Sequence, residues 1–419
     1  MTNYLLNLDG RILRILRFIG KEADRREMSA YVVGGFVRDL ILKKKNLDLD
    51  ITIDGDAIAL SKILAKKWKA HVTVYQQFGT SFLELPNGIR VDVAKTRNEL
   101  YKHSGALPTV KAGSLKEDLF RRDFTINALA IGINSDTWGH LIDLFGGHKD
   151  LLDKKIRVLH GQSFIDDPTR ILRAVRFEQR LKFQIERRTL TMIKLALKRG
   201  VEEKVKPPRY FAEFKKIFKE SSPMAMIKRL IALGGLRFIN SKLSVSLRDL
   251  KVIHEKIQEL KGTLLYKKYS SWWVVYFIEL IAKTNDNVVE KIIGKFHFTR
   301  NEIICIQQSR NIGDILKKIS GKSLKASHIY KILKPLKEGV ILYLYLKSDN
   351  ALVHRRINRF LLEDVNAKLR INGNDLRKMG IAPGPRTGEI LDRILRLKID
   401  KQIQTKREEC NEALRIIGK

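Results

Sequence analysis

The sequence predicts an α+β fold, in which a small mixed α/β domain is followed by an elongated all-helical remainder. Two observations indicate this division. The first third alternates short β-rich runs with helical stretches, whereas from about Asp150 onward long helical periodicity replaces the strand signal. The helical part is interrupted at Pro207-Pro208, at residues 221–223, at Gly234-Gly235 and in a loop at residues 381–388.

The first chemically informative element is the stretch YVVGGFVRDLILKKK, residues 31–45. It reads as an apolar strand over residues 31–33, a Gly34-Gly35 pair, and a helix that starts near Phe36. Paired glycines at such a junction let backbone N–H groups approach a phosphate closely, and a helix N-terminus adds partial positive charge. Arg38 lies in the first helical turn, so the stretch predicts a phosphate-binding turn.

The next element, NLDLDITI at residues 46–53, is a strand with two acidic residues. Because side chains alternate along a strand, Asp48 and Asp50 share one face, while Leu47, Leu49 and Ile51 point into a core. The interpretation without a functional role is an exposed strand with solvated carboxylates. Following a phosphate-binding turn, however, a pair of carboxylates that can hold Mg²⁺ indicates nucleotidyl transfer.

The sequence then predicts a helix over residues 56–70 and three further strands, at residues 71–77, 80–85 and 89–96. Gly79 and the turn at residues 86–88 separate these strands. If the last strand pairs beside the Asp48–Asp50 strand, Asp92 supplies a third carboxylate to the same site. The alternative is a solvated strand aspartate.

Two arginine-rich stretches follow the strands. EDLFRRDFTINALAI, residues 117–131, sets polar side chains into an apolar amphipathic pattern: Arg121, Arg122, Asp123 and Asn127. DDPTRILRAVRFEQRLKF, residues 166–183, places Arg170, Arg173 and Arg176 three residues apart after Pro168. On a helix started by that proline the arginines form a positive ridge, facing either a cleft or solvent.

The chain is strongly basic, with 81 Lys and Arg against 46 Asp and Glu, a net charge of +35. This favours a nucleic acid partner, although a lysine-rich proteome would give the same excess. No apolar run reaches the length of a membrane span, and the N-terminus reads as a helix rather than a signal peptide, so we expect no membrane partner and a cytoplasmic protein. Cys305 and Cys410 indicate neither a disulfide framework nor a zinc site.

Five motifs occur in order over residues 31–183: VGGFVRD, LDLDI, DLFRRDFTINALA, DLFGGHKDLLDKKIRVLH and DDPTRILRAVRF. This series resembles that of the bacterial-type (class II) tRNA nucleotidyltransferase and poly(A) polymerase family. Residues 371–391 resemble the family's C-terminal region more loosely. The resemblance implies a nucleotidyltransferase head (1–150), a helical neck that recognises the base (151–220), a helical body (221–340) and a helical tail that binds tRNA (341–419).

The resemblance also implies roles for individual residues. Asp48 and Asp50 would bind Mg²⁺, with Asp92 as a third catalytic carboxylate. The nucleotide would be contacted by Gly34, Gly35, Arg38, Arg122 and Asn127, and its base would be read by Asp167 and Arg170, with Arg173 and Arg176 nearby. An aspartate that accepts and an arginine that donates can together mimic a base edge. Alternatively, Asp167 caps a helix and pairs with Arg170.

The implied activity is template-independent addition of all or part of the 3′-terminal CCA to tRNA from CTP and/or ATP. The implied partners are the tRNA 3′ end and elbow and, for partial addition, a second nucleotidyltransferase. Residues 97–114 lack the acidic and paired-arginine pattern common in full CCA-adding members, and Pro208-Arg209, followed by Glu213, replaces the usual Glu-Arg pair. CC-only or A-only addition therefore stays open, and the pattern YxxxGALPTV resembles the branch that includes A-adding enzymes.

Two other functions stay open. The first is a poly(A) polymerase that acts on other RNA 3′ ends. The second is a catalytically silent RNA-binding protein that keeps the fold, against which the intact Asp48 and Asp50 argue.

Overall fold

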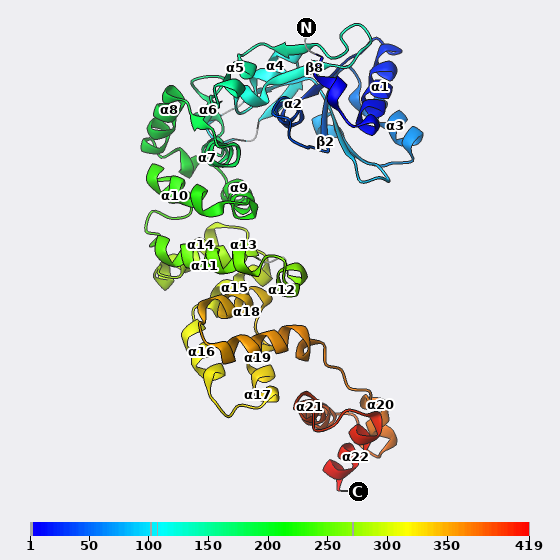
Figure 1. Cartoon of the computed structure of the whole chain (residues 1–419), viewed down its shortest axis with the longest axis vertical. Helices are drawn as coiled ribbons and strands as arrows, with labels where there is room; N and C mark the ends of the chain where they lie inside the picture. The colour runs from blue at the N-terminus through cyan, green and yellow to red at the C-terminus, as the bar shows by residue number, and fades with distance from the viewer. Residues whose placement is uncertain (1–2, 101–102, 107, 270–271, 419) are drawn as a thin grey trace. The chain divides into compact units, whose positions relative to one another are not determined.

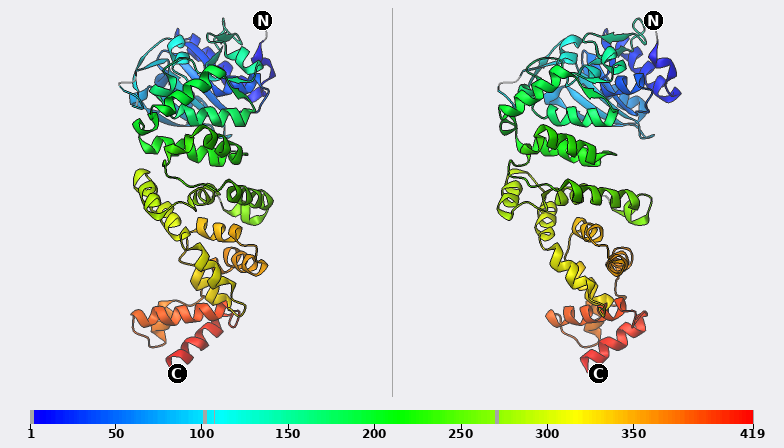
Figure 2. Two further views of the ribbon diagram at one scale, coloured as in Figure 1. Left: turned by 90° about the vertical axis from the view of Figure 1, so that its left-hand side faces the viewer. Right: turned by 60° about the vertical axis from the view of Figure 1, so that its left-hand side comes forward.

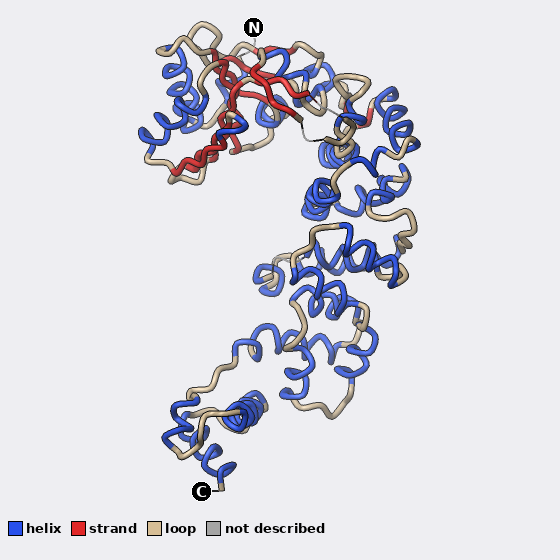
Figure 3. Tube along the Cα trace, turned by 180° about the vertical axis from the view of Figure 1, so that it is seen from behind, coloured by secondary structure: helices blue, strands red, loops and turns tan. Residues whose placement is uncertain are grey.

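The computed structural model describes residues 3–100, 103–106, 108–269 and 272–418. The chain divides into two compact units, Met1–Phe238 and Ile239–Lys419 (Figure 1). Among the described residues, the strands lie in the first unit and the second consists of helices and loops (Figure 3). The predicted fold class, a mixed α/β head domain followed by a long helical region, is confirmed. Tyr101 and Leu107 of the YxxxGALPTV pattern lie outside the described residues.

The strands of the first unit are β1 (Ser29–Val33), β2 (Asp48–Asp54), β3 (His71–Tyr75), β4 (Thr80–Glu84), β5 (Arg90–Lys95), β6 (Arg97–Leu100), β7 (Thr109–Ala112), β8 (Leu129–Gly132), β9 (Leu141–Asp143), β10 (Lys155–Ile156) and β11 (Gln184–Ile185). Its helices are α1 (Gly10–Asp24), α2 (Gly35–Ile41), α3 (Ala57–Trp68), α4 (Leu115–Phe120), α5 (Gly147–Leu152), α6 (Ser163–Asp166), α7 (Arg170–Leu181), α8 (Arg187–Lys198), α9 (Pro207–Lys219) and α10 (Pro223–Leu233).

The main sheet has seven strands in the order β3-β4-β5-β2-β1-β8-β9. Only β2 and β5 run parallel among its pairs, and the others are antiparallel. The helices α1 and α3 pack against each other and against the sheet, while α2 packs on β1, β2 and β8. The predicted pairing of the Asp92 strand beside the Asp48–Asp50 strand is therefore confirmed.

One local expectation needs correction. Leu47 was expected to point into the core, but β2 begins only at Asp48 and Leu47 is 41% exposed, whereas Leu49 and Ile51 are buried. Residues 97–114, for which no structure was predicted, contain a hairpin of β6 and β7. Side-chain alternation applies only inside a strand, so it does not predict the orientation of Leu47, which precedes β2.

The helical elements of the first unit start and stop where the sequence breaks. α9 begins at Pro207, α10 begins at Pro223, and α10 ends before Gly234, whose φ of 75° favours glycine. The predicted boundaries at residues 150, 220 and 340 stay predictions. The division between the compact units falls at Phe238, inside the predicted body.

The second unit contains α11 (Leu247–Leu260), α12 (Leu264–Lys268), α13 (Trp272–Ile281), α14 (Asp286–Lys295), α15 (Arg300–Ser309), α16 (Ile312–Ser320), α17 (Ala326–Leu333), α18 (Glu338–Lys347), α19 (Ala351–Leu362), α20 (Gly373–Lys378), α21 (Pro385–Ile399) and α22 (Lys406–Ile417) (Figure 2). The last three helices enclose a small apolar core of Ile371, Leu376, Ile381, Ile390, Ile394 and Ala413. In the described part of the chain, no helix combines the length and the apolar character that crossing a membrane requires.

Candidate active site

The turn between β1 and α2 requires a glycine. Gly34 has φ 70° and ψ −130°, and a Cβ added to it would lie 2.6 Å from Arg122 Nη1. On the following helix, buried Arg38 donates from Nε to Asp39 Oδ1 (2.9 Å) and from Nη1 to Asn127 Oδ1 (2.6 Å). The turn and Arg38 therefore form one fixed wall of the site.

Three carboxylates lie close together on two neighbouring strands of the sheet, β2 and β5. Asp48 and Asp50 alternate with buried Leu49 on β2, and Asp92 on β5 stands opposite Asp50 in the parallel register. All three line a cavity of about 590 Å³. We call Asp48, Asp50 and Asp92 the carboxylate edge.

The carboxylate edge concentrates negative charge that the neighbouring arginines offset only in part. Burial raises the pKa of Asp50 to about 6; attraction by Arg122 opposes this rise, and repulsion from Asp92 and Asp48 adds to it. Burial and the neighbouring Asp48 likewise raise the pKa of Asp92. Such a donor set fits a divalent cation. No preassembled cluster of three or more His, Cys, Asp or Glu side chains occurs among the described residues, so other ligands would have to complete the coordination.

A second cavity, of about 440 Å³, adjoins the first and shares Arg38, Asp50 and Arg180 with it. We call it the arginine pocket. Its walls come from the glycine turn with α2, from β2 and β6, from the segment after α4, and from α7 with the turn before it. The wall residues are Gly34, Gly35, Arg38, Asp50, Glu99, Arg121, Arg122, Asp123, Asn127, Asp167, Arg170, Arg173, Phe177 and Arg180.

Arg122 lines the arginine pocket. Its Nη2 donates to buried Asp118 Oδ2 (2.9 Å), and its charge attracts Asp50. The Nε atom of Arg122 is buried and has no hydrogen-bond acceptor among the described residues. A buried donor without an acceptor is costly.

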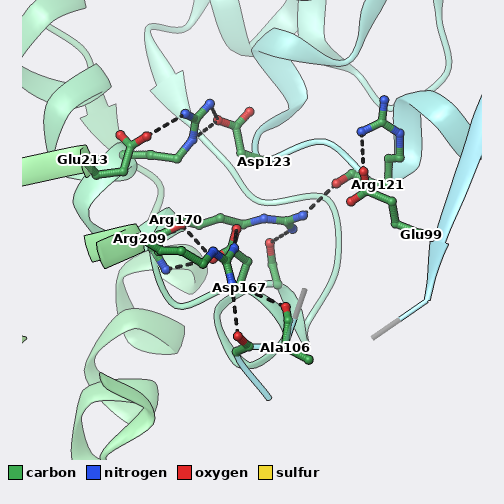
Figure 4. A network of polar contacts seen from close by, with 12 residues as sticks. Glu99, Ala106, Arg121, Asp123, Asp167, Arg170, Arg209 and Glu213 are labelled. Carbon is green, nitrogen blue, oxygen red and sulfur yellow. Dashed lines mark hydrogen bonds and ion pairs between the residues drawn. The ribbon is translucent and has the colours of Figure 1, made fainter. Parts of the chain in front are cut away.

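Asp123 and Arg173 form a partly buried ion pair in the wall of the arginine pocket, in which Asp123 is the buried partner. Arg173 Nε donates to Asp123 Oδ2 (2.8 Å), and Arg173 Nη1 lies 3.4 Å from Glu213 Oε1 (Figure 4). Although burial alone would raise the pKa of Asp123, Arg173 and Asn127 hold it at about 2. Asp123 in turn raises the pKa of Arg173. This pair is fully ionised at neutral pH.

The two residues expected to read the base are both held in place. Buried Arg170, the first residue of α7, donates to Ser163 Oγ (2.6 Å) and to the Arg121 carbonyl (2.7 Å). Asp167 Oδ1 accepts from the Thr169 backbone N–H (3.1 Å) and Oγ–H (2.7 Å). Asp167 Oδ2 pairs with Arg209 (2.9 Å). The alternative of a capping Asp167 is wrong on both points: the N-cap of α7 is Thr169, without a side-chain capping hydrogen bond, and the ion pair of Asp167 is with Arg209 rather than with Arg170.

The structure brings all the residues expected at the site into these two cavities. Asp48, Asp92 and Arg176 line the cavity of the carboxylate edge, Asp50 and Arg38 line both, and the others line the arginine pocket. Arg176 lies near Glu213 (3.4 Å) and Glu220 (3.7 Å). The roles of these residues stay predictions.

Several residues in the walls of the arginine pocket were not predicted from the sequence. Phe177 and Arg180 follow Arg173 at four and seven residues on α7, a spacing that would have placed them on the same helix face. Arg121 and Asp123 stand in the quoted stretch without an assigned contact. Glu99 lies on β6 and pairs with Arg121 (2.8 Å), and no pattern in the sequence around it indicated that it would line the pocket.

Comparison with known proteins places this site in a family. Residues 30–157 match the model of the poly A polymerase head domain. The chain is 31% identical to the A-adding tRNA nucleotidyltransferase of Halalkalibacterium halodurans, over 93% of this chain and 89% of that protein. The chain belongs to the tRNA nucleotidyltransferase family.

Two further similarities agree with this membership. The A-adding tRNA nucleotidyltransferase of Geobacter sulfurreducens is 38% identical over 96% of this chain, which spans 47% of that relative's length. A solved complex of a CCA-adding enzyme with ATP superposes with a TM-score of 0.76 and 31% identity, over 99% of this chain and 98% of the other. The chain thus spans about half the length of the first curated relative and nearly all of the solved structure.

Proposed function

We propose that the chain adds nucleotides, chiefly AMP from ATP, to the 3′ end of tRNA without a nucleic acid template and releases pyrophosphate. The observation that carries the proposal is that the carboxylate edge and the arginine pocket adjoin and share Arg38, Asp50 and Arg180. A nucleoside triphosphate needs carboxylate-bound cations near its phosphates and hydrogen-bonding groups near its base. Both requirements are met within one continuous site.

The nucleotidyltransferase family generally uses divalent metal ions. We propose Mg²⁺, because it is commonly bound by one or two carboxylates while substrate phosphates complete its coordination. Asp48 and Asp50 would hold it, with Asp92 adding negative charge from the neighbouring strand. When bound, the ion would polarise the reacting phosphate and favour the ionised form of the attacking hydroxyl.

The remaining side chains would bind and orient the nucleotide. Gly34, Gly35 and Arg38 would contact the triphosphate, and the guanidinium of Arg122 would face the nucleotide. Asp167 and Arg170 would present an acceptor and donors to the base edge. Because both are already held by protein groups, their orientation would be set before the nucleotide enters.

Addition of A alone is favoured over full CCA addition. The Halalkalibacterium and Geobacter relatives bear the name A-adding, and residues 97–114 depart from the pattern of full CCA-adding members. A separate CC-adding nucleotidyltransferase would then supply the two preceding C residues, and this chain would complete the CCA end. We further propose that the tail helices contact the tRNA elbow, and that the reaction takes place in the cytoplasm.

The test offers the purified chain four RNAs: tRNA ending at the discriminator base, at C, at CC, and an unrelated RNA. Each is incubated with Mg²⁺ and one nucleotide at a time and resolved on a denaturing gel. The proposal expects one added A on the CC-ending tRNA and little else. Extension of all three tRNAs would indicate a full CCA-adding enzyme, and repeated A addition to the unrelated RNA would indicate a poly(A) polymerase.

A further inference from the structure

A short segment between β6 and β7 is seated on the turn that leads to Asp167. Ser104 Oγ donates to the Ile165 carbonyl (2.6 Å), and the Gly105 N–H donates to the Asp166 carbonyl (3.2 Å). Gly105 has φ 72°, and a Cβ added to it would lie 2.6 Å from the Lys204 carbonyl oxygen. The segment therefore packs too closely for any residue but glycine at this position.

One arginine joins this segment to Asp167. Arg209 Nη1 donates to the Gly105 carbonyl (3.1 Å) and the Ala106 carbonyl (3.4 Å), while its Nη2 pairs with Asp167 Oδ2 (2.9 Å) (Figure 4). Arg209 follows Pro207 and Pro208 at the start of α9, where the prolines restrict the backbone. A planar guanidinium can make these contacts at once, which an ammonium group cannot do with the same geometry.

The same hairpin is also connected to Arg170, the second residue proposed to read the base. Arg170 is held by the Arg121 carbonyl (2.7 Å), and the Arg121 side chain pairs with Glu99 on β6 (2.8 Å). Both residues proposed to read the base are thus connected to the β6–β7 hairpin, Asp167 through Arg209 and Arg170 through Arg121. A change in the position of the hairpin would therefore alter the orientation of both side chains.

We infer that Arg209 is a positioning residue for nucleotide choice, which fixes the Asp167 carboxylate and couples its orientation to the seating of residues 104–106. The inference rests on the proposed function, because it concerns how that site selects a base. Arg209 acts through Asp167 and is not itself placed against the nucleotide.

Three variants test the coupling from both sides. Arg209→Met removes the guanidinium, Arg209→Lys keeps the charge but not the planar fork, and Gly105→Ala unseats the segment while leaving Arg209 and Asp167 in place. The matched control is Lys219→Met, which removes a positive charge from an exposed position at the end of the same helix. The readouts are the Kd values for ATP, CTP and GTP with Mg²⁺, and kcat/KM for ATP and CTP on tRNA ending in CC.

We expect Arg209→Met to lower the preference for ATP over CTP by about tenfold, part of the discrimination typical of a base contact. Arg209→Lys should fall between Arg209→Met and wild type, and Gly105→Ala should shift the preference in the same direction. The double variant, Arg209→Met with Gly105→Ala, should lose less of the preference for ATP than the product of the two single losses, because both substitutions act on one coupling. Lys219→Met should keep the wild-type preference.

The inference is overturned if Arg209→Met loses stability or kcat while its nucleotide preference stays that of wild type. A wild-type preference in Gly105→Ala would also overturn the coupling; if that variant does not fold, the two Arg209 variants decide. Failure of the proposed function looks different: the wild-type chain would extend no tRNA, and the ratio of Kd values would still test Arg209. Equal Kd values for all nucleotides in the wild-type chain would overturn the inference directly.

Discussion

The carboxylate edge and the arginine pocket adjoin, yet they balance their charges in opposite ways. Along the edge, Asp50 and Asp92 repel Asp48 and each other, and burial raises the pKa of both Asp50 and Asp92. In the pocket, Asp123 is paired with Arg173, and Asp167 is paired with Arg209. The difference predicts that the carboxylate edge takes up cations, whereas the ion pairs of the pocket are formed before a ligand arrives.

The largest expected effect comes from removing charge at the edge. Asp48→Asn or Asp50→Asn should lower the rate of nucleotide transfer by a factor on the order of a thousand or more, because several kcal/mol of metal-dependent stabilisation are lost. The free energy of unfolding should stay unchanged or rise slightly, since repulsion between neighbouring carboxylates is relieved. Single-turnover rates and thermal unfolding of each variant measure the two effects.

Asp54→Asn is the matched control for this pair, because Asp54 is exposed at the end of the same strand and lines neither cavity. It should transfer nucleotides like wild type. Rates within tenfold of wild type for both Asp48→Asn and Asp50→Asn would refute the metal-binding role of the edge.

Removing charge from the pocket should instead cost stability. Asp123→Asn leaves Arg173 without its principal carboxylate and should lower the free energy of unfolding by about 3 kcal/mol, the lower end for breaking a buried ion pair, since Glu213 stays nearby. Urea unfolding of the full chain measures the change. Asp9→Asn, which breaks an exposed pair with Arg11, should leave the urea midpoint nearly unchanged. Equal effects from the two variants would mean that the pocket is not held together by this pair.

The same pair predicts a smaller effect of pH. The pKa of Asp123 is about 2 in the folded chain, below the usual value of about 3.9, so the folded state favours the charged form. Its contribution is complete above about pH 4 and is lost as the pH falls toward 2. The difference in unfolding free energy between wild type and Asp123→Asn should therefore narrow between pH 5 and pH 2.5. A difference that stays constant over this range would contradict the ionised pair.

Local patterns in the sequence were enough to predict the carboxylate edge. The alternation in residues 46–53 and the glycine pair before them placed Asp48, Asp50, Gly34 and Gly35 correctly, because strand period and turn chemistry are local properties. The parallel partner Asp92 was also expected, on the condition that its strand paired beside β2, which it does.

The pairings of the arginine pocket could not be predicted in the same way. Arg173 meets Asp123 across 50 residues, and Arg209 meets the Gly105 carbonyl across 104 residues. The spacing of arginines on α7 predicted a positive ridge, but nothing local indicated which carboxylates would neutralise it. Long-range pairing depends on how α7, α9 and the hairpin pack, and short-range periodicity contains no information about that packing.

The central claim, that the edge takes up divalent cations and the pocket does not, is tested most directly by following thermal unfolding of the full chain during a Mg²⁺ titration at constant ionic strength. A ligand that binds only the folded state raises its stability in a saturable way. The account predicts a saturable rise in the unfolding midpoint for wild type, its loss in Asp50→Asn, and its retention in Asp123→Asn from a lower starting midpoint. An identical response in wild type and Asp50→Asn, or its loss in Asp123→Asn alone, would contradict the account.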